Sequence, residues 1–154
     1  MNRKRVGILV FPQVEVLDFC GPFEVFSVTR LNESARREES SPFEVLLVAE
    51  TVEPVSATGG LRVVPDVTID ACPPLDVLIV PGGWGTRREI KNERLLAWIK
   101  ARGASVETLT SAGISAGIDM ALRVVARYHG EEVARNTARH MEYRYVPEDN
   151  SRRI

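Results

Sequence analysis

The sequence predicts an α/β protein built on a doubly wound, mostly parallel sheet. Three runs of branched apolar residues, at 6–11, 43–49 and 77–80, are typical of strands buried on both faces of a sheet. Segments with apolar residues at helical spacing lie between and after these runs, and strands that alternate with helices indicate a doubly wound layer. A length of 154 residues suits one core, so we expect a single domain over 1–154.

Composition narrows the class of protein. A net charge of -1 favours neither nucleic acid nor an anionic membrane. The two cysteines, Cys20 and Cys72, are too few for a disulfide framework or a zinc site, so we expect reduced thiols and a cytoplasmic location. No segment approaches the ~20 apolar residues that span a bilayer. The sequence has no Walker loop, no paired metal-ligand histidines and no dinucleotide fingerprint, so we expect neither metal nor cofactor.

The first half of the chain predicts two strands, a helix and a hairpin. The strand 6–11 ends at Pro12, and a loop over 13–20 leads to a helix over 22–31 with Pro22 in its first turn. A charged surface segment, 32–41, precedes the strand 43–49. The loose alternation over 52–67, with a turn at 58–60, predicts a small hairpin.

The second half predicts two strands and three helices. The strand 77–80 is followed by a helix over 94–102 that Gly103 ends, and then by a strand over 106–110. Apolar residues at helical spacing predict an amphipathic helix over 114–128, and a further helix follows Gly130. The polar tail 147–154 is expected to fray.

A glycine turn follows the strand 77–80. It reads Pro-Gly-Gly-Trp-Gly over 81–85, and its glycines allow a sharp turn and a close approach of the backbone to a ligand. Ligands of open α/β sheets lie beyond the carboxyl ends of the strands. We therefore expect Gly83, Trp84 and Gly85 to bind substrate; the alternative is a tight strand-to-helix turn without chemistry.

Asp18 and Cys20 lie in the loop expected after the first strand, at the same sheet edge as the glycine turn. A carboxyl group there can orient or activate a nucleophile or a water molecule, and the alternative is that Asp18 caps the helix near Gly21. A thiolate at Cys20 would be favoured by the nearby helix start, although most cysteines are inert packing residues.

Ser115 lies within Gly113-Ile114-Ser115-Ala116-Gly117, which matches the G-x-S-x-G elbow between a strand and a helix. A serine nucleophile needs a base. The histidines, His129 and His140, come late in helices, where we expect them to be exposed and far from the strand ends. The alternative is that the small residues let the helix pack closely on the sheet.

Three stretches, 6–26, 76–85 and 109–122, together resemble the isonitrile hydratase branch of the ThiJ/PfpI superfamily, and the resemblance extends over nearly the whole chain. It implies a flavodoxin-like, glutamine amidotransferase-like domain that is usually dimeric. It also implies a lyase activity, the addition of water to an isonitrile to give an N-substituted formamide.

The resemblance implies roles for particular residues. In this branch a cysteine on a strand-to-helix elbow attacks the isonitrile carbon, assisted by a threonine and an aspartate. Asp18 matches the aspartate, and Gly83 and Trp84 match backbone donors. The cysteine has no counterpart, because the strand that begins at 104–107 joins directly to 108–113 and roughly sixty residues of the pattern are missing. Ser111 or Ser115 would then stand in place of the thiol.

Two hypotheses follow. The first is an isonitrile hydratase-like enzyme that uses Asp18 and the glycine turn. The second is a catalytically silent module for small-molecule binding or oligomerisation, and a regulatory sensor domain is a further option. The missing layer would leave apolar surface for another copy of the chain to cover, so we expect a homodimer.

Overall fold

The computed structural model describes residues 3–110 and 116–147. It contains a five-stranded sheet in the order β5-β2-β1-β6-β7, in which every neighbouring pair is parallel. Its strands are β1 (Lys4–Leu9), β2 (Phe43–Ala49), β5 (Val67–Thr68), β6 (Val77–Val80) and β7 (Glu107–Thr110). The predicted parallel α/β sheet is therefore confirmed.

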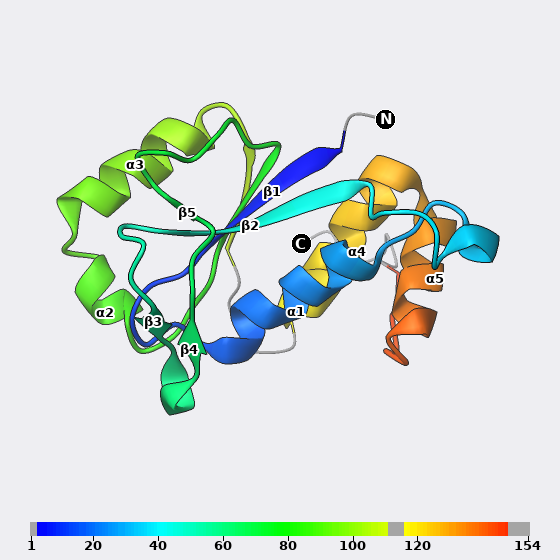
Figure 1. Ribbon diagram of the computed structural model, residues 1–154, viewed down its shortest axis with the longest axis horizontal. Coiled ribbons are helices and arrows are strands. Elements are labelled where there is room, and N and C mark those ends of the chain that lie inside the picture. The colour runs from blue at the N-terminus through cyan, green and yellow to red at the C-terminus, as the bar shows by residue number, and fades with distance from the viewer. Residues whose placement is uncertain (1–2, 111–115, 148–154) are drawn as a thin grey trace, which may run out of the picture.

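Helices cover both faces of this sheet (Figure 1). On one side lie α1 (Val16–Val28), α4 (Ala116–His129) and α5 (Glu131–His140), and on the other lie α2 (Thr86–Glu89) and α3 (Glu93–Gly103). The helices over 94–102 and after Gly130 were predicted, whereas the single turn of α2 was not. Among the described residues, no helix is both long and apolar enough to cross a membrane.

The predicted hairpin is present, but it forms a two-stranded sheet of its own. Its antiparallel strands are β3 (Val55–Ser56) and β4 (Arg62–Val63), and the short helix η2 (Thr58–Gly60) makes the turn between them. A second short helix, η1 (Glu33–Ala35), lies in the charged segment. The hairpin lies beside the start of α1, at the end of the sheet where β1 and β6 terminate (Figure 1).

The core lies on both faces of the central strands. β1 and β6 present fully buried side chains because neighbouring strands flank each of them and helices cover them from both sides. The largest of the fully buried side chains include Phe26, Phe43, Ile8, Leu78 and Ile79. Burial of these residues fixes the sheet, and the sheet fixes the loops at its carboxyl edge.

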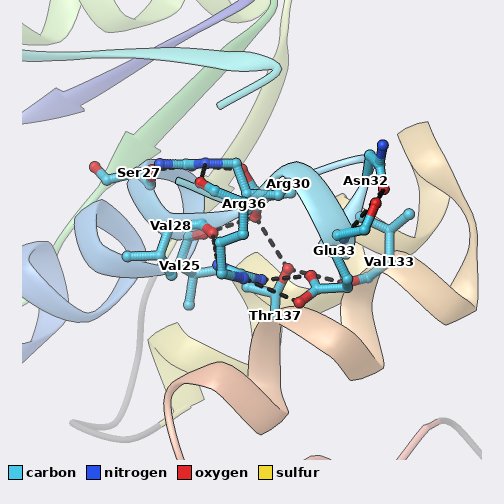
Figure 2. Close-up of polar contacts among 11 residues, drawn as sticks. Val25, Ser27, Val28, Arg30, Asn32, Glu33, Arg36, Val133 and Thr137 are labelled. Atoms are coloured by element: carbon cyan, nitrogen blue, oxygen red, sulfur yellow. Dashed lines mark hydrogen bonds and ion pairs between the residues drawn. The ribbon is translucent and has the colours of Figure 1, made fainter. Parts of the chain in front are cut away.

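Two arginines satisfy the carbonyl groups at the end of α1 (Figure 2). Arg36 Nη1 donates to the Val28 carbonyl at 2.6 Å, and Arg30 Nη1 donates to the Ser27 carbonyl at 2.9 Å. In the same region the buried Thr137 of α5 lies 3.4 Å from Thr29, measured between their hydroxyl oxygens. These contacts join α1, η1 and α5 into one layer.

Candidate active site

Asp18 lies in the first turn of α1, and its side chain is 3% exposed. The expected helix over 22–31, with Asp18 in the preceding loop, was wrong because α1 already begins at Val16. The residue before the helix, Glu15, makes no side-chain cap, so the sequence carries no capping signal for this start. Pro22 lies inside the helix, where it removes the hydrogen bond that would have joined its nitrogen to the Asp18 carbonyl.

The peptide groups of Gly82 hold the start of α1 against the glycine turn. The Gly82 N–H donates to Asp18 Oδ2 at 2.9 Å, and the Glu15 N–H donates to the Gly82 carbonyl at 3.0 Å. The structure therefore brings Asp18 and the glycine turn together, as the sequence predicts. Asp18 does not cap the helix near Gly21; its carboxylate accepts a hydrogen bond from a different segment. Sequence reasoning singled out this turn but missed Gly82 as the donor.

The second carboxylate oxygen of Asp18 is the unusual feature of this arrangement. Asp18 Oδ1 is buried and has no hydrogen-bond partner among the described residues. A buried polar atom without a partner is costly, and natural proteins retain few of them. A molecule that donates a hydrogen bond to Oδ1 would remove this cost, so Asp18 is suited to hold a water molecule or a polar ligand.

The glycines of the turn are needed because the turn packs against its own chain. A Cβ atom on Gly83, whose φ is 125°, would lie 2.4 Å from the Glu15 nitrogen, and a Cβ atom on Gly85 would lie 2.0 Å from the Pro12 carbonyl oxygen. The Gly85 N–H donates to the Gln13 carbonyl at 3.1 Å. The predicted close approach is therefore real, but its partner is the loop 12–15.

This packing leaves two backbone donors unused. Within the described part of the chain, the N–H groups of Gly83 and Trp84 make no hydrogen bond. The Trp84 side chain is 63% exposed, and the Arg87 guanidinium lies 4.2 Å from its ring centre. Among the described residues, the turn thus has two amide donors without a partner and an exposed aromatic side chain, and its role in substrate binding stays a prediction.

The two cysteines lack the features of an activated thiol. Cys20 is half-buried within α1, and burial raises the pKa of its thiol. Cys72 is buried between β5 and β6, and burial raises its pKa as well, with Arg102 and Arg5 opposing the shift. A thiolate is the reactive form of cysteine, so neither environment favours a nucleophile.

The two candidate serines, Ser111 and Ser115, lie outside the described residues. The elements on either side of them are described: β7 ends at Thr110, and α4 begins at Ala116. Thr110 pairs with Val80, the last residue of the strand that leads into the glycine turn. The strand-to-helix context of the G-x-S-x-G pattern is therefore present.

The histidines do not supply a base to this region. His140 is exposed as predicted, but His129 is half-buried, with its ring 5.1 Å from the ring of Phe43. Phe43 begins β2 and pairs with Lys4 at the amino edge of the sheet, whereas Asp18 follows the carboxyl end of β1. His129 and Asp18 therefore lie at opposite edges.

Comparison with known proteins gives a consistent result. A sequence model described as the DJ-1/PfpI family matches residues 4–122. An isonitrile hydratase from Pseudomonas putida is 35% identical over 108 residues, which make up 70% of this chain and 42% of that protein. The chain thus spans less than half the length of this curated relative.

Solved structures share the fold. A ThiJ/PfpI family protein from Pseudomonas syringae has a TM-score of 0.81 at 23% identity, over 99% of this chain and 80% of that chain. The oxidized DJ-1 of Toxoplasma gondii has a TM-score of 0.69 at 19% identity, over 92% of this chain and 100% of that chain. At these identities the likeness concerns the fold.

Proposed function

We propose that this chain, which belongs to the DJ-1/PfpI family, is an isonitrile hydratase-like protein that adds water to small isonitriles at Asp18. One observation carries the proposal: the buried Asp18 carboxylate is held by the Gly82 N–H through one oxygen, while its other oxygen has no partner among the described residues. The related isonitrile hydratase supports the substrate class.

The reaction needs a proton and a hydroxyl group on the same carbon atom. In the proposed route, the Asp18 carboxylate takes a proton from a water molecule as the water oxygen attacks the terminal carbon of the isonitrile, and the resulting carboxyl group then gives this proton to the same carbon. The product, R–N=CH–OH, then moves its hydroxyl proton to nitrogen and becomes the formamide. The N–H groups of Gly83 and Trp84, which have no partner among the described residues, would donate hydrogen bonds to the isonitrile nitrogen as a lone pair forms on it.

Water replaces the thiol in this proposal because neither cysteine is activated. Burial raises the pKa of both Cys20 and Cys72, and a neutral thiol is a poor nucleophile. Both thiols are free of disulfide bonds, which supports a cytoplasmic location as part of the proposal.

The test is to incubate the purified protein with a simple alkyl isonitrile and to measure the N-alkyl formamide over time. Asp18→Asn keeps the shape of the side chain and an oxygen for the Gly82 N–H, but it cannot exchange the proton. We expect formamide production to fall by about a hundredfold or more in this variant.

Cys20→Ser and Cys72→Ser serve as matched controls and are expected to keep the activity. Formamide production that survives Asp18→Asn, or that disappears in Cys20→Ser, would contradict the proposed route. Thermal unfolding of each variant separates loss of chemistry from loss of fold.

A catalytically silent module that binds small molecules and assembles into dimers is the second candidate. It is favoured by the absence of an activated thiol and by apolar side chains that the described part of the chain leaves uncovered. Leu17 and Phe23 of α1 are 37% and 36% exposed, and β7 is an edge strand of the sheet that the described residues form. A second copy of the chain would cover such surfaces.

The assembly is tested by light scattering coupled to size exclusion. We expect a dimer for the natural sequence and a monomer for Phe23→Glu, because a buried charge without a partner opposes association. Val64→Glu, at an exposed site outside α1, is the matched control and should stay dimeric. A natural chain that elutes as a monomer would remove the dimer from the proposal.

A further inference from the structure

A cavity of about 300 Å³ lies at the carboxyl ends of β1 and β2, between the hairpin strand β3 and the helices α2 and α3. Its floor is apolar and includes Leu9, Phe11, Val55 and Leu95, each less than 9% exposed. Ligand sites are typically concave, mostly apolar and at least about this large, with a few polar groups that fix orientation.

This cavity is separate from the Asp18 site. Phe11 and Pro12 line it, and the same two residues contact Gly85 of the glycine turn, where a Cβ atom would lie 2.9 Å from Phe11 Cδ2. Asp18 and Gly82 are not among the lining residues. The loop 11–15 therefore forms a wall between the cavity and the Asp18 site.

Carboxylates dominate the charge around the cavity. Glu50 and Glu53 line it, and Glu53 is exposed and makes no hydrogen bond or ion pair with any described residue. Glu50 Oε2 accepts from Asn92 Nδ2 at 2.7 Å, while its Oε1 lies 3.7 Å from the Arg94 guanidinium.

The cation at the rim is already neutralised. Arg88 lines the cavity, but its Nε donates to Glu89 Oε1 at 2.8 Å, and Glu89 is only 7% exposed. The charge of Arg94 is also neutralised, because its guanidinium pairs with Asp70 at 2.6 Å. The unpaired charge at the rim is therefore negative, so the cavity favours a cation over an anion.

We propose that this cavity binds a small organic cation, a primary amine with a short apolar body. The ammonium group would pair with Glu53 and with the less engaged oxygen of Glu50, and the apolar body would lie on the floor formed by Leu9, Phe11 and Leu95. The volume, at the low end for ligand sites, limits the ligand to about the size of one aromatic ring with a short chain.

A ligand in the cavity would alter the surroundings of the glycine turn, because the loop 11–15 lies between them. Gln13 has a φ of 63°, its N–H donates to the Ser56 carbonyl at 2.8 Å, and its carbonyl accepts from the Gly85 N–H. A ligand against Phe11 and Pro12 therefore changes the surroundings of the Gly85 amide without touching it. This amide is a reporter for the experiment.

The experiment is a titration of the isotope-labelled protein with benzylamine, followed by amide NMR at about pH 7, where the amine is charged. Benzyl alcohol has the same shape and no charge, and it is the matched probe. We expect benzylamine to shift the amides of Leu9, Glu53 and Gly85, and benzyl alcohol to bind roughly fivefold more weakly.

Glu53→Gln removes the unpaired charge at an exposed position where the fold is not at risk. We expect it to reduce benzylamine binding to the level of benzyl alcohol, whereas Glu132→Gln on the exposed face of α5 leaves binding unchanged. Equal binding of the two probes, unaltered binding in Glu53→Gln, or shifts centred on Asp18 would each overturn the proposal. Because the readout involves no isonitrile, it is independent of the proposed hydration.

Discussion

The peptide groups around Gly82 position the Asp18 side chain and the start of α1. One peptide N–H fixes the Asp18 carboxylate, and the Gly82 carbonyl accepts the N–H of the residue before α1. Gly83 and Gly85 then allow the turn to lie against the loop 12–15 at distances that a Cβ atom does not permit. The candidate catalytic carboxyl group is therefore positioned by backbone groups, whose geometry depends on the absence of two side chains.

Gly83→Ala tests this dependence. Both Gly83 and Gly60 have positive φ, but a Cβ atom on Gly60 meets nothing within 4 Å, so Gly60→Ala carries only the conformational cost. We expect Gly83→Ala to lower the free energy of unfolding by about 1–3 kcal/mol more than Gly60→Ala, because the loop must move aside. Urea denaturation of both variants measures the difference. An equal decrease in the free energy of unfolding in the two variants would contradict the expectation, because it would show that the loop moves aside at no energetic cost.

The end of α4 meets the start of β2 in an aromatic cluster. The rings of Phe26 and Phe43 lie 4.9 Å apart, and Tyr128 and His129 of α4 contact Phe43 edge-on. His129 Nε2 is buried without a hydrogen-bond partner among the described residues. The neutral imidazole thus serves as an apolar packing group, and a charge would be disfavoured there.

This packing makes stability depend on pH. Burial, with the nearby Lys4 ammonium, lowers the pKa of His129, so the unfolded chain takes up a proton more readily than the folded one. The contribution of neutral His129 to the free energy of unfolding is fully present above about pH 6.5, the pKa of an unperturbed histidine. This contribution is lost as the pH falls through the lowered pKa of His129 in the folded protein.

We expect the free energy of unfolding to fall between about pH 7.5 and pH 5.5, and to fall less in His129→Leu. Urea denaturation at both pH values measures the change. His140→Leu, on the exposed end of α5, is the control for a histidine without this packing and should follow the natural protein. A natural protein and a His129→Leu variant with the same pH dependence would contradict the argument.

The architecture of the whole molecule could be predicted from its sequence. The branched apolar runs mark β1, β2 and β6 because strands buried on both faces need such residues, and β2 and β6 have the predicted bounds. The meeting of Asp18 with the glycine turn could also be predicted, since parallel strands bring their carboxyl ends to one edge.

The remaining features depend on contacts between distant segments. The start of α1 has no side-chain cap and is fixed instead by hydrogen bonds to Gly82, which no local pattern reveals. His129 is half-buried because Phe43 lies beside it, although its neighbours in the sequence are polar. The cavity with Glu50 and Glu53 combines β1, β2, the hairpin and two helices, so its existence follows from packing alone.

The central position of β1 has a consequence for synthesis on the ribosome. This strand emerges before the other strands of its sheet, yet its two partners are β2, where Phe43 pairs with Lys4, and β6, where Val77 pairs with Val6. At ~5–20 residues per second the nascent apolar strand waits on the order of seconds for either neighbour. During synthesis the chain therefore passes through an interval in which chaperones can bind a segment whose last four residues are buried in the folded protein.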